Sequence, residues 1–272
     1  MIPAPTGHLR VRAARAGPRT VLSEVARTAP FHLGRASHRG NDGAAEAIVQ
    51  QVGPGLFPGE TLRVEVAVDP GAALTLRGQA ATKVYPCPDP DGTPARLETR
   101  LRVAAGATLA YLPGALIPFR DAALVQETVV DLAPGARFAL AEILTPGRVA
   151  MGERDAYRRL DLRLRIRLGG RLLLVERADL EPARRPTAAP GRHGGFAAAG
   201  TLYLVGFPVP AAWATPQTVG PVRWAAGATG PLTVLRLLGD SAQAVAAAIA
   251  ARLRETAAEQ GTAPSGPYHA PT

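Results

Sequence analysis

An internal repeat constrains the fold of this chain more than any other feature of its sequence. Four stretches align without gaps, each with a glycine in a short run of small residues: 69–76, 104–111, 133–140 and 167–174. Proline or a small residue followed by glycine permits the positive φ angle that a tight reversal requires. We therefore predict that each stretch is a turn between two β-strands.

The segments beside these turns alternate apolar and polar residues, as half-buried strands do. In the clearest example, from Leu160 to Leu168, the leucines and Ile166 alternate with Asp161 and three arginines. A similar alternation over 62–68 leads into the first turn. Because the turn glycines recur every thirty-odd residues, we expect stacked strand-turn-strand repeats that form a mainly β body of the β-coil or β-helix type.

One α-helix is predicted near the end of the chain, from about 241 to 260, with few other helices. Asp240 is placed to cap it, and Gln243 occupies the capping-box position. Val245, Ile249 and Leu253 form an apolar stripe at helical spacing.

The remaining loop-forming segments do not divide the chain, so we expect a single domain over 1–260. Segments dense in glycine, proline or aspartate predict loops at 34–43, 86–94 and 180–195. Residues 261–272 are rich in proline, glycine, serine and threonine, so we expect a disordered tail there.

Composition excludes several classes of function. The net charge is +9, but Lys83 is the only lysine and the arginines are dispersed without interleaved aromatic residues, so nucleic-acid binding is not expected. The single cysteine, Cys87, excludes an internal disulfide, and no secretion signal is recognisable, so we expect a cytoplasmic protein. The longest uncharged stretch, 193–222, is repeatedly broken by glycine and proline, so no membrane span is expected.

The sequence contains only weak candidates for catalytic or metal-binding residues. No nucleophile elbow or phosphate-binding loop is present, and His193-Gly194-Gly195 is interpreted as a flexible turn. Cys87 with Asp89 and Asp91 does not have the spacing of a known metal cage. His32 and His38 are interpreted as surface histidines.

An enzymatic alternative rests on two glutamates. Glu142 and Glu176 occupy the same place in successive repeats, where they could stack as an acid and base pair on one face of a β-coil. That arrangement would suit a polysaccharide-active β-helix enzyme. Solvated strand carboxylates beside arginines such as Arg177 are the simpler interpretation. The outward arginines of 160–168 are likewise either a solvated face or a dock for an acidic partner.

The segment from Gln79 to Tyr85, QAATKVY, follows the first repeat and resembles a signature of the urease accessory protein family UreD, also called UreH. Further similar pieces occur in the family's order at 50–62, 106–113, 117–119, 135–138, 142–144, 152–153 and 237–240. The resemblance covers roughly 8 to 253. Gly59-Glu60 replaces the family's usual Gly-Asp, and Gly114-Ala115 replaces its Gln-Glu.

This resemblance implies a β-coil protein with a few helices that is not an enzyme. It would be a urease maturation chaperone that binds the urease apoprotein and UreF, and the GTPase UreG through UreF. Nickel would be inserted into the urease active site in that complex, passing along this chain without a tightly bound cofactor. The C-terminal helix or nearby loops would meet UreF, and polar interior positions would line a nickel route.

The resemblance also selects candidate interaction residues. Gln79, Thr82, Lys83 and Tyr85 are the candidate functional patch, although Lys83 and Tyr85 could equally close one end of a sheet. The other candidates, all within the matching segments, are Gly59, Glu60, Tyr111, Pro113 and Glu142.

Overall fold

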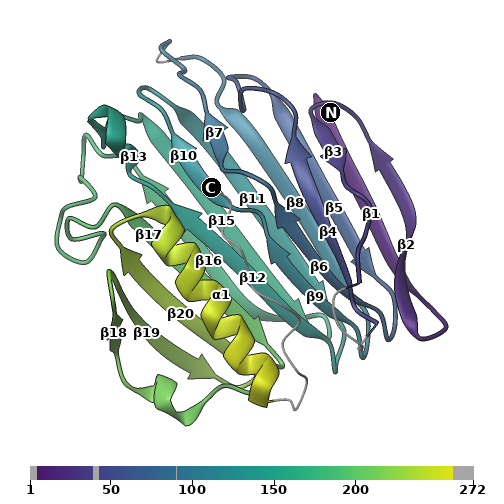
Figure 1. The fold of residues 1–272 in the computed structure, drawn as a ribbon. Helices are drawn as coiled ribbons and strands as arrows, with labels where there is room; N and C mark the ends of the chain where they lie inside the picture. Colours follow the sequence, from purple (N-terminus) through teal and green to yellow (C-terminus); the bar gives the residue numbers. More distant parts are fainter. Residues whose placement is uncertain (1–4, 39–42, 90, 260–272) are drawn as a thin grey trace.

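Two β-sheets packed face to face account for most of the chain (Figure 1). The computed structural model describes residues 5–38, 43–89 and 91–259. The first sheet has the strand order β16-β15-β11-β8-β5-β1-β2. Its strands are β1 (Gly7–Ala16), β2 (Arg19–Arg27), β5 (Thr61–Val68), β8 (Ala95–Val103), β11 (Ala123–Leu132), β15 (Arg159–Leu168) and β16 (Arg171–Leu180).

The second sheet has the order β18-β19-β20-β17-β12-β9-β6-β4-β3, and β10 joins β12 to β7 beside this path. Its strands are β3 (Phe31–Leu33), β4 (Ala45–Gln51), β6 (Ala73–Gly78), β7 (Thr82–Val84), β9 (Thr108–Leu112), β10 (Ala115–Pro118), β12 (Arg137–Leu144), β17 (Ala198–Val205), β18 (Gln217–Val219), β19 (Val222–Thr229) and β20 (Leu232–Gly239). A small hairpin, β13 (Gly147–Arg148) and β14 (Glu153–Arg154), surrounds the short 3-10 helix η1 (Val149–Met151). A second short helix, η2 (Ala211–Ala214), precedes β18.

The first three repeat turns carry the chain from the first sheet to the second. They connect β5 to β6, β8 to β9, and β11 to β12. Successive repeats pair in parallel within each sheet. The turns also stack, because the Ala104 amide donates to Val68 and the Ala133 amide donates to Val103. Gly71, Gly106 and Gly135 adopt φ angles of 70°, 66° and 78°, as the turn prediction requires.

The fourth turn behaves differently, and the expectation of a β-coil body is therefore not confirmed. Gly169 and Gly170 both have positive φ angles, 57° and 78°. Two consecutive residues of this kind make a tight hairpin, so β15 returns antiparallel as β16 within the first sheet. Antiparallel pairs also join β1 to β2 and β17 to β20. The sheets are mixed, while the mainly β composition is as expected.

The predicted C-terminal helix is present as α1 (Ala242–Glu259), which lies across the outer face of the second sheet (Figure 1). Its cap differs from the prediction, because the Ser241 hydroxyl, and not Asp240, accepts the hydrogen bond of the Ala244 amide at 3.1 Å. Val245 and Ile249 are buried as predicted, and Leu253 is partly buried. Within the described ranges, no helix combines the length and apolar character that crossing a membrane requires. The predicted tail, 261–272, lies outside the described residues.

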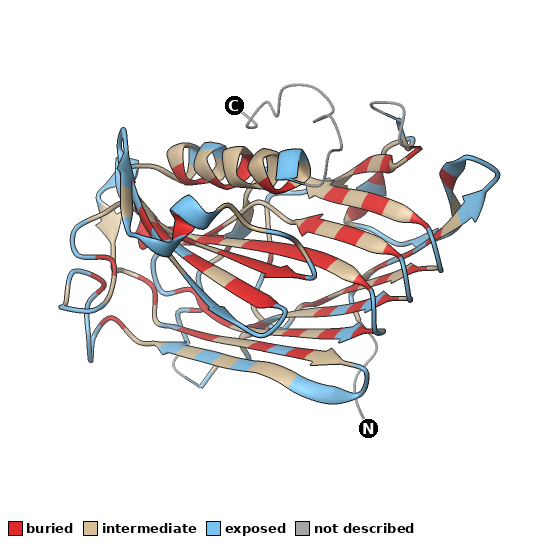
Figure 2. Ribbon diagram, turned by 90° about the horizontal axis from the view of Figure 1, so that it is seen from below, coloured by how far each residue is buried: buried red, intermediate tan, exposed pale blue. Residues whose placement is uncertain are grey.

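Two hydrophobic clusters hold these three layers together. The first lies between the sheets and includes residues of the alternating strands, such as Val64, Val66 and Leu164. The second lies between the second sheet and α1 and includes Trp213 and Trp224. Figure 2 shows buried residues alternating along the strands and lining the side of α1 that faces the sheet. Each element therefore buries one face, as layered folds require.

Candidate functional site

A cavity of about 530 Å³ lies between the two sheets. Strands β8, β11, β15 and β16 contribute its lining from the first sheet, and β9, β12, β17 and β20 contribute it from the second. The loop between β16 and β17 supplies Thr187 and His193. Part of the wall is polar, which distinguishes this space from the apolar packing elsewhere between the sheets.

Five side chains form an interior polar cluster in this wall: Gln126, Glu142, Glu176, Tyr203 and Arg236. Gln126 donates its amide Nε2–H to Glu142 at 3.0 Å. Arg236 donates two hydrogen bonds to the Glu176 carboxylate, at 2.8 and 2.6 Å, and the Tyr203 hydroxyl donates to the same carboxylate at 3.0 Å. The Arg236 side chain is 55% exposed, so the cluster extends from the cavity to the surface.

The electrostatics differ between the two carboxyl groups. Burial raises the pKa of Glu142 to about 7, and the negative charge of Glu176 acts in the same direction. Burial likewise raises the pKa of Tyr111 to about 12 and the pKa of Tyr203 further still. Glu142 can therefore gain or lose a proton near neutral pH, while Glu176 is held by Arg236. Hard or borderline cations could find oxygen ligands here, although a cage of several carboxylates is lacking.

The structure divides the candidate residues between the cavity and the surface. Thr82, Tyr111, Pro113 and Glu142 line the cavity. Lys83 and Gln79 are exposed, and the Gln79 amide donates to the Val49 carbonyl at 2.8 Å. Because Thr82 and Lys83 alternate on a short strand, the four residues of the QAATKVY patch do not share one face.

Tyr85 belongs to an aromatic stack at one end of the sheets. Its ring lies 4.5 Å from that of Phe57 and 4.9 Å from that of Phe119. The Arg148 guanidinium lies 4.1 Å from the centre of the Phe119 ring. Tyr85 therefore packs against aromatic rings at one end of the sheets.

Gly59 and Glu60 shape the approach to β5. Gly59 has a φ angle of 76°, and the Glu60 carboxylate accepts a hydrogen bond from the Phe57 amide at 2.9 Å. Glu60 therefore stabilises a turn through its own backbone neighbourhood.

Glu142 and Glu176 meet in the cavity, but not by stacking on one face as the enzymatic alternative supposes. They approach from opposite sheets, on β12 and β16, because the fourth turn returns the chain within the first sheet. Gln126, Tyr203 and Arg236 are not among the residues predicted from the sequence. Tyr203 stands in the run Leu202-Tyr203-Leu204, where all three residues are buried, so alternation gave no signal.

The other candidate metal ligands, Cys87, His32 and His38, do not form a site together. Cys87 is buried, and its sulfur accepts a hydrogen bond from Arg158 at 3.3 Å. His32 and His38 are exposed, as predicted. No group of three or more histidine, cysteine, aspartate or glutamate residues suited to a metal ion occurs in the described part of the chain.

The arginine face of β15 consists of ion pairs. Arg163 and Arg177 both bind Asp161, and Arg165 and Arg167 pair with acidic residues of β11 at 3.6 Å. The pairing with arginine holds the pKa of Asp161 well below its usual range. The exposed pairs of Arg165 and Arg167 fit the solvated-face interpretation, whereas Asp161 is buried between its two arginines.

Comparison with known proteins gives a consistent result. The family model described as UreD urease accessory protein matches residues 5–267. Three relatives carry the name urease accessory protein UreD. The Opitutus terrae protein is 40% identical over 64% of this chain and 63% of its own length. The Actinomyces naeslundii protein is 31% identical over 86% of this chain and 88% of its own length, and the Sorangium cellulosum protein is 33% identical over 92% and 80%.

Proposed function

The chain belongs to the UreD urease accessory protein family, and from this premise we propose that it acts in urease maturation as a protein-binding factor and not as an enzyme. The family match over nearly the whole chain is the observation that carries this proposal. Its proposed partners are the urease apoprotein and UreF, with UreG recruited through UreF. Its proposed setting is the cytoplasm.

We place the proposed nickel route in the cavity between the sheets. Nickel would be cargo in transit and not a resident cofactor. The support is chemical: Glu176 and Arg236 form a charged pair that reaches the surface, and Glu142, which lines the same cavity, would supply an oxygen ligand. A single carboxylate with a pKa near 7 binds a cation less tightly than a cage of ionised ligands does, and weak binding suits transport.

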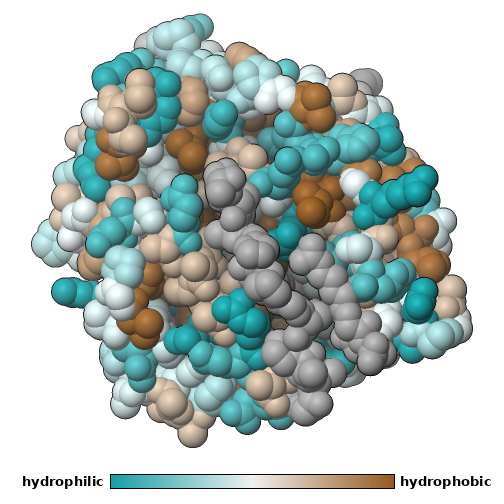
Figure 3. All heavy atoms as spheres, in the orientation of Figure 1, coloured by the Kyte–Doolittle hydropathy of each residue, from teal (hydrophilic) through white to brown (hydrophobic). Residues whose placement is uncertain are grey.

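For UreF, we propose a contact with α1. An apolar groove of about 230 Å³ runs between this helix and β10, and Ala246, Ala250 and Ile117 line it. On the face seen in Figure 3, hydrophobic side chains form separate small groups among hydrophilic ones. A groove of this kind suits the insertion of an apolar side chain from a partner, and it is less suited to a wide, flat interface.

The first experiment is urease activity in nickel-grown cells that carry the matching urease operon with or without this gene. We expect urease protein to accumulate without activity when the gene is missing, and activity to return when it is restored. Activity that is unaffected by the deletion would refute the maturation role.

Within that assay, Glu142→Gln tests the nickel route. Glu127→Gln is a matched control, because Glu127 lies on β11 beside Gln126 but pairs with Arg165 on the outer face. We expect Glu142→Gln to lower activation and Glu127→Gln to leave it unchanged. Equal activation by both variants would remove Glu142 from the route.

The UreF contact has its own matched pair on one helix. Ala246→Arg places a charge in the groove, whereas Ala258→Arg places the same charge at an exposed position that does not line it. We expect only Ala246→Arg to abolish copurification with UreF. If the Ala246→Arg protein still copurifies with UreF, the contact does not lie at this groove.

The polysaccharide-hydrolase alternative is not proposed for this chain. Arg236 and Tyr203 occupy both oxygens of Glu176, which leaves it poorly placed to serve as a nucleophile or base.

A further inference from the structure

The two sheets do not end at the same place beside β16. Glu176 of β16 contacts Arg236 of β20 at 2.6 Å, so these two strands face each other across the sheets. The first sheet ends at β16, whereas the second sheet continues past β20 to β19 and β18 (Figure 1). The second sheet therefore projects beyond the first by the width of β19 and β18.

The projecting strand β19 has an uncovered inner face. Opposed residues of an antiparallel pair lie on the same face, and Gly227 of β19 is opposed to Val234 of β20. Val234 packs against the core between the sheets, so this face of β19 points toward the layer of the first sheet. Its four residues are all exposed: Arg223, Ala225, Gly227 and Thr229.

The first sheet offers a free strand edge at the same place. β16 pairs with β15 on one side, and in the described ranges no strand pairs with its other side. Leu172 lies opposite Arg167 on the outer face and is 59% exposed. Val175 lies opposite Arg165 on the same face and is 56% exposed. Unpaired backbone groups beside exposed apolar side chains are a template for an added strand.

The free edge of β16 and the inner face of β19 together form a step, which has the dimensions of one strand. Facing sheets pack about 10 Å apart, and neighbouring strands lie about 4.8 Å apart. A strand added to β16 would therefore lie in the layer of the first sheet and be covered by β19. The small residues Ala225 and Gly227 leave space for its side chains.

Charge selects the kind of strand that fits the step. Arg171 is exposed and lies opposite Leu168, which packs against the core, so Arg171 belongs to the inner side of β16. With Arg223 and Arg236, the inner side of the step carries three arginines against one acid, Glu176. A strand with acidic side chains facing inward and apolar side chains facing outward would complement both sides.

Neither a second copy of the chain nor its own ends fit this step. If two β16 strands paired symmetrically, both second sheets would lie on the same side of the joined sheet. Strand β20 of one copy would then meet β19 of the other. Residues 260–272 contain three prolines and no acidic residue, and residues 1–4 contain no acidic residue either. Proline cannot donate a hydrogen bond to a strand ladder.

We propose that the step between β16 and β19 binds an extended acidic segment of a partner protein, which adds to β16 as a further strand. Backbone hydrogen bonds along 171–176 would supply affinity, and Arg171 and Arg223 would select acidic side chains. This proposal does not depend on the role in urease maturation.

Two synthetic peptides of equal composition test the step on the purified full-length chain. One repeats glutamate-valine four times, and the other has four glutamates followed by four valines. Fluorescence anisotropy measures their affinities. We expect the alternating peptide to bind roughly tenfold more tightly, because only its side chains match the two faces of a strand. It should also slow hydrogen-deuterium exchange of the backbone amides in 171–176.

Charge-reversal variants locate the contact. Arg171→Glu and Arg223→Glu should each weaken binding of the alternating peptide by roughly tenfold. Arg19→Glu is the control, because Arg19 is exposed on β2 at the other edge of the first sheet and its reversal changes the net charge equally. Unchanged thermal unfolding midpoints would show that the variants fold.

Three results would each overturn the proposal. They are equal binding of the two peptides by the parent protein, unchanged amide exchange over 171–176 in the presence of the alternating peptide, and equal effects of Arg19→Glu and Arg223→Glu. The first two use only the parent protein, so the test does not depend on the folding of any variant.

Discussion

Glu142 shows how the environment of one residue sets its chemistry. It lies on a strand whose other inward positions, such as Phe138 and Leu140, are apolar. Burial and the charge of Glu176 together raise its pKa to about 7. The folded protein therefore binds a proton at Glu142 more tightly than the unfolded chain does. Linkage then requires stability to fall as pH rises from the unfolded pKa toward the folded one.

Glu142→Gln should remove this pH dependence. The variant should resemble the parent near pH 5 and gain free energy of unfolding relative to it near pH 8.5, on the order of 2 kcal/mol. Urea denaturation at both pH values measures the difference. Glu127→Gln should show no such gain, and a Glu142→Gln protein that is less stable than its parent at the higher pH would contradict the assigned cause.

At the scale of elements, α1 packs closely on two glycines. A Cβ atom at Gly200 of β17 would lie 2.4 Å from a methyl group of Val245, and one at Gly239 of β20 would lie 2.7 Å from the other methyl. These glycines therefore fix how near the helix approaches the sheet. The sequence places Val245 on the apolar stripe, but the need for glycine opposite it arises only from packing.

Gly200→Ala should destabilise the protein by about 1–3 kcal/mol through overpacking, measured by chemical denaturation. Adding Val245→Ala should recover part of this loss, because it removes the methyl groups that clash. Gly227→Ala is the control, since a Cβ at Gly227 would meet no atom within 4 Å. Equal effects of Gly200→Ala and Gly227→Ala would indicate a general cost of replacing strand glycine and no specific contact with α1.

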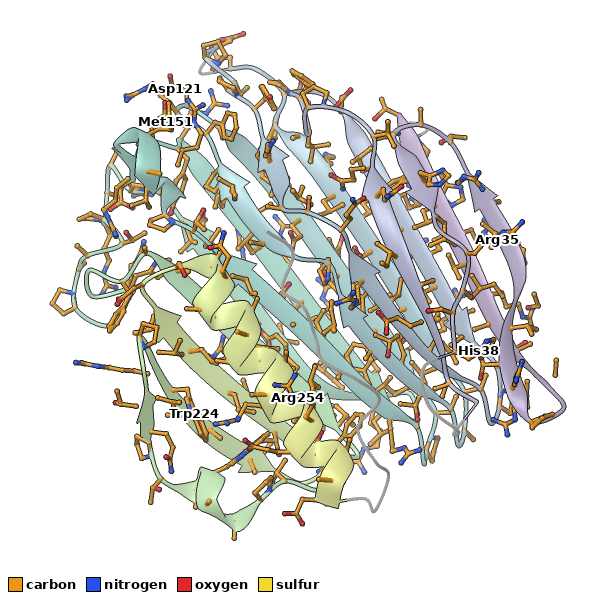
Figure 4. The ribbon with its side chains drawn as sticks, in the orientation of Figure 1. Arg35, His38, Asp121, Met151, Trp224 and Arg254 are labelled. Atoms are coloured by element: carbon orange, nitrogen blue, oxygen red, sulfur yellow. The ribbon has the colours of Figure 1, made fainter. Side chains whose placement is uncertain are left out.

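At the scale of the whole molecule, one hydrophobic cluster joins the two sheets and a second joins α1 to the second sheet. Both tryptophans of the chain lie in the second cluster, with ring centres 5.8 Å apart, and Trp213 donates to Glu255 of α1 at 2.8 Å. Figure 4 shows Trp224 on the part of the sheet beside α1. Tryptophan fluorescence therefore reports on the docking of this helix.

Truncation after Asp240 should expose both indole rings while the first cluster still joins the sheets. We expect tryptophan emission to shift to longer wavelength and the far-ultraviolet circular dichroism of the strands to remain. Loss of both signals would show that the sheet pair depends on α1, and an unchanged emission spectrum would contradict the placement of the tryptophans.

Local pattern was sufficient for the repeat turns, the strands beside them and the C-terminal helix. The turn glycines, the alternation over 160–168 and the stripe of Val245 and Ile249 each depend on residues close in sequence, and the corresponding turns, strands and helix are present. The family resemblance likewise came from ordered short segments, and the match over 5–267 confirms it.

Only the tertiary structure decided which strands face one another. Consecutive positive φ angles at Gly169 and Gly170 make the fourth repeat a hairpin within one sheet. The glycine pattern that all four repeats share did not predict this difference. Arg236 and Glu176 are 60 residues apart in the chain and meet at 2.6 Å, and Asp155 reaches Thr187 across a separation of 32 residues. The first contact depends on the stacking of two sheets and the second on the path of the loop after β16. Spacing along one strand carries no information about the side chains that an opposite sheet or a distant loop presents.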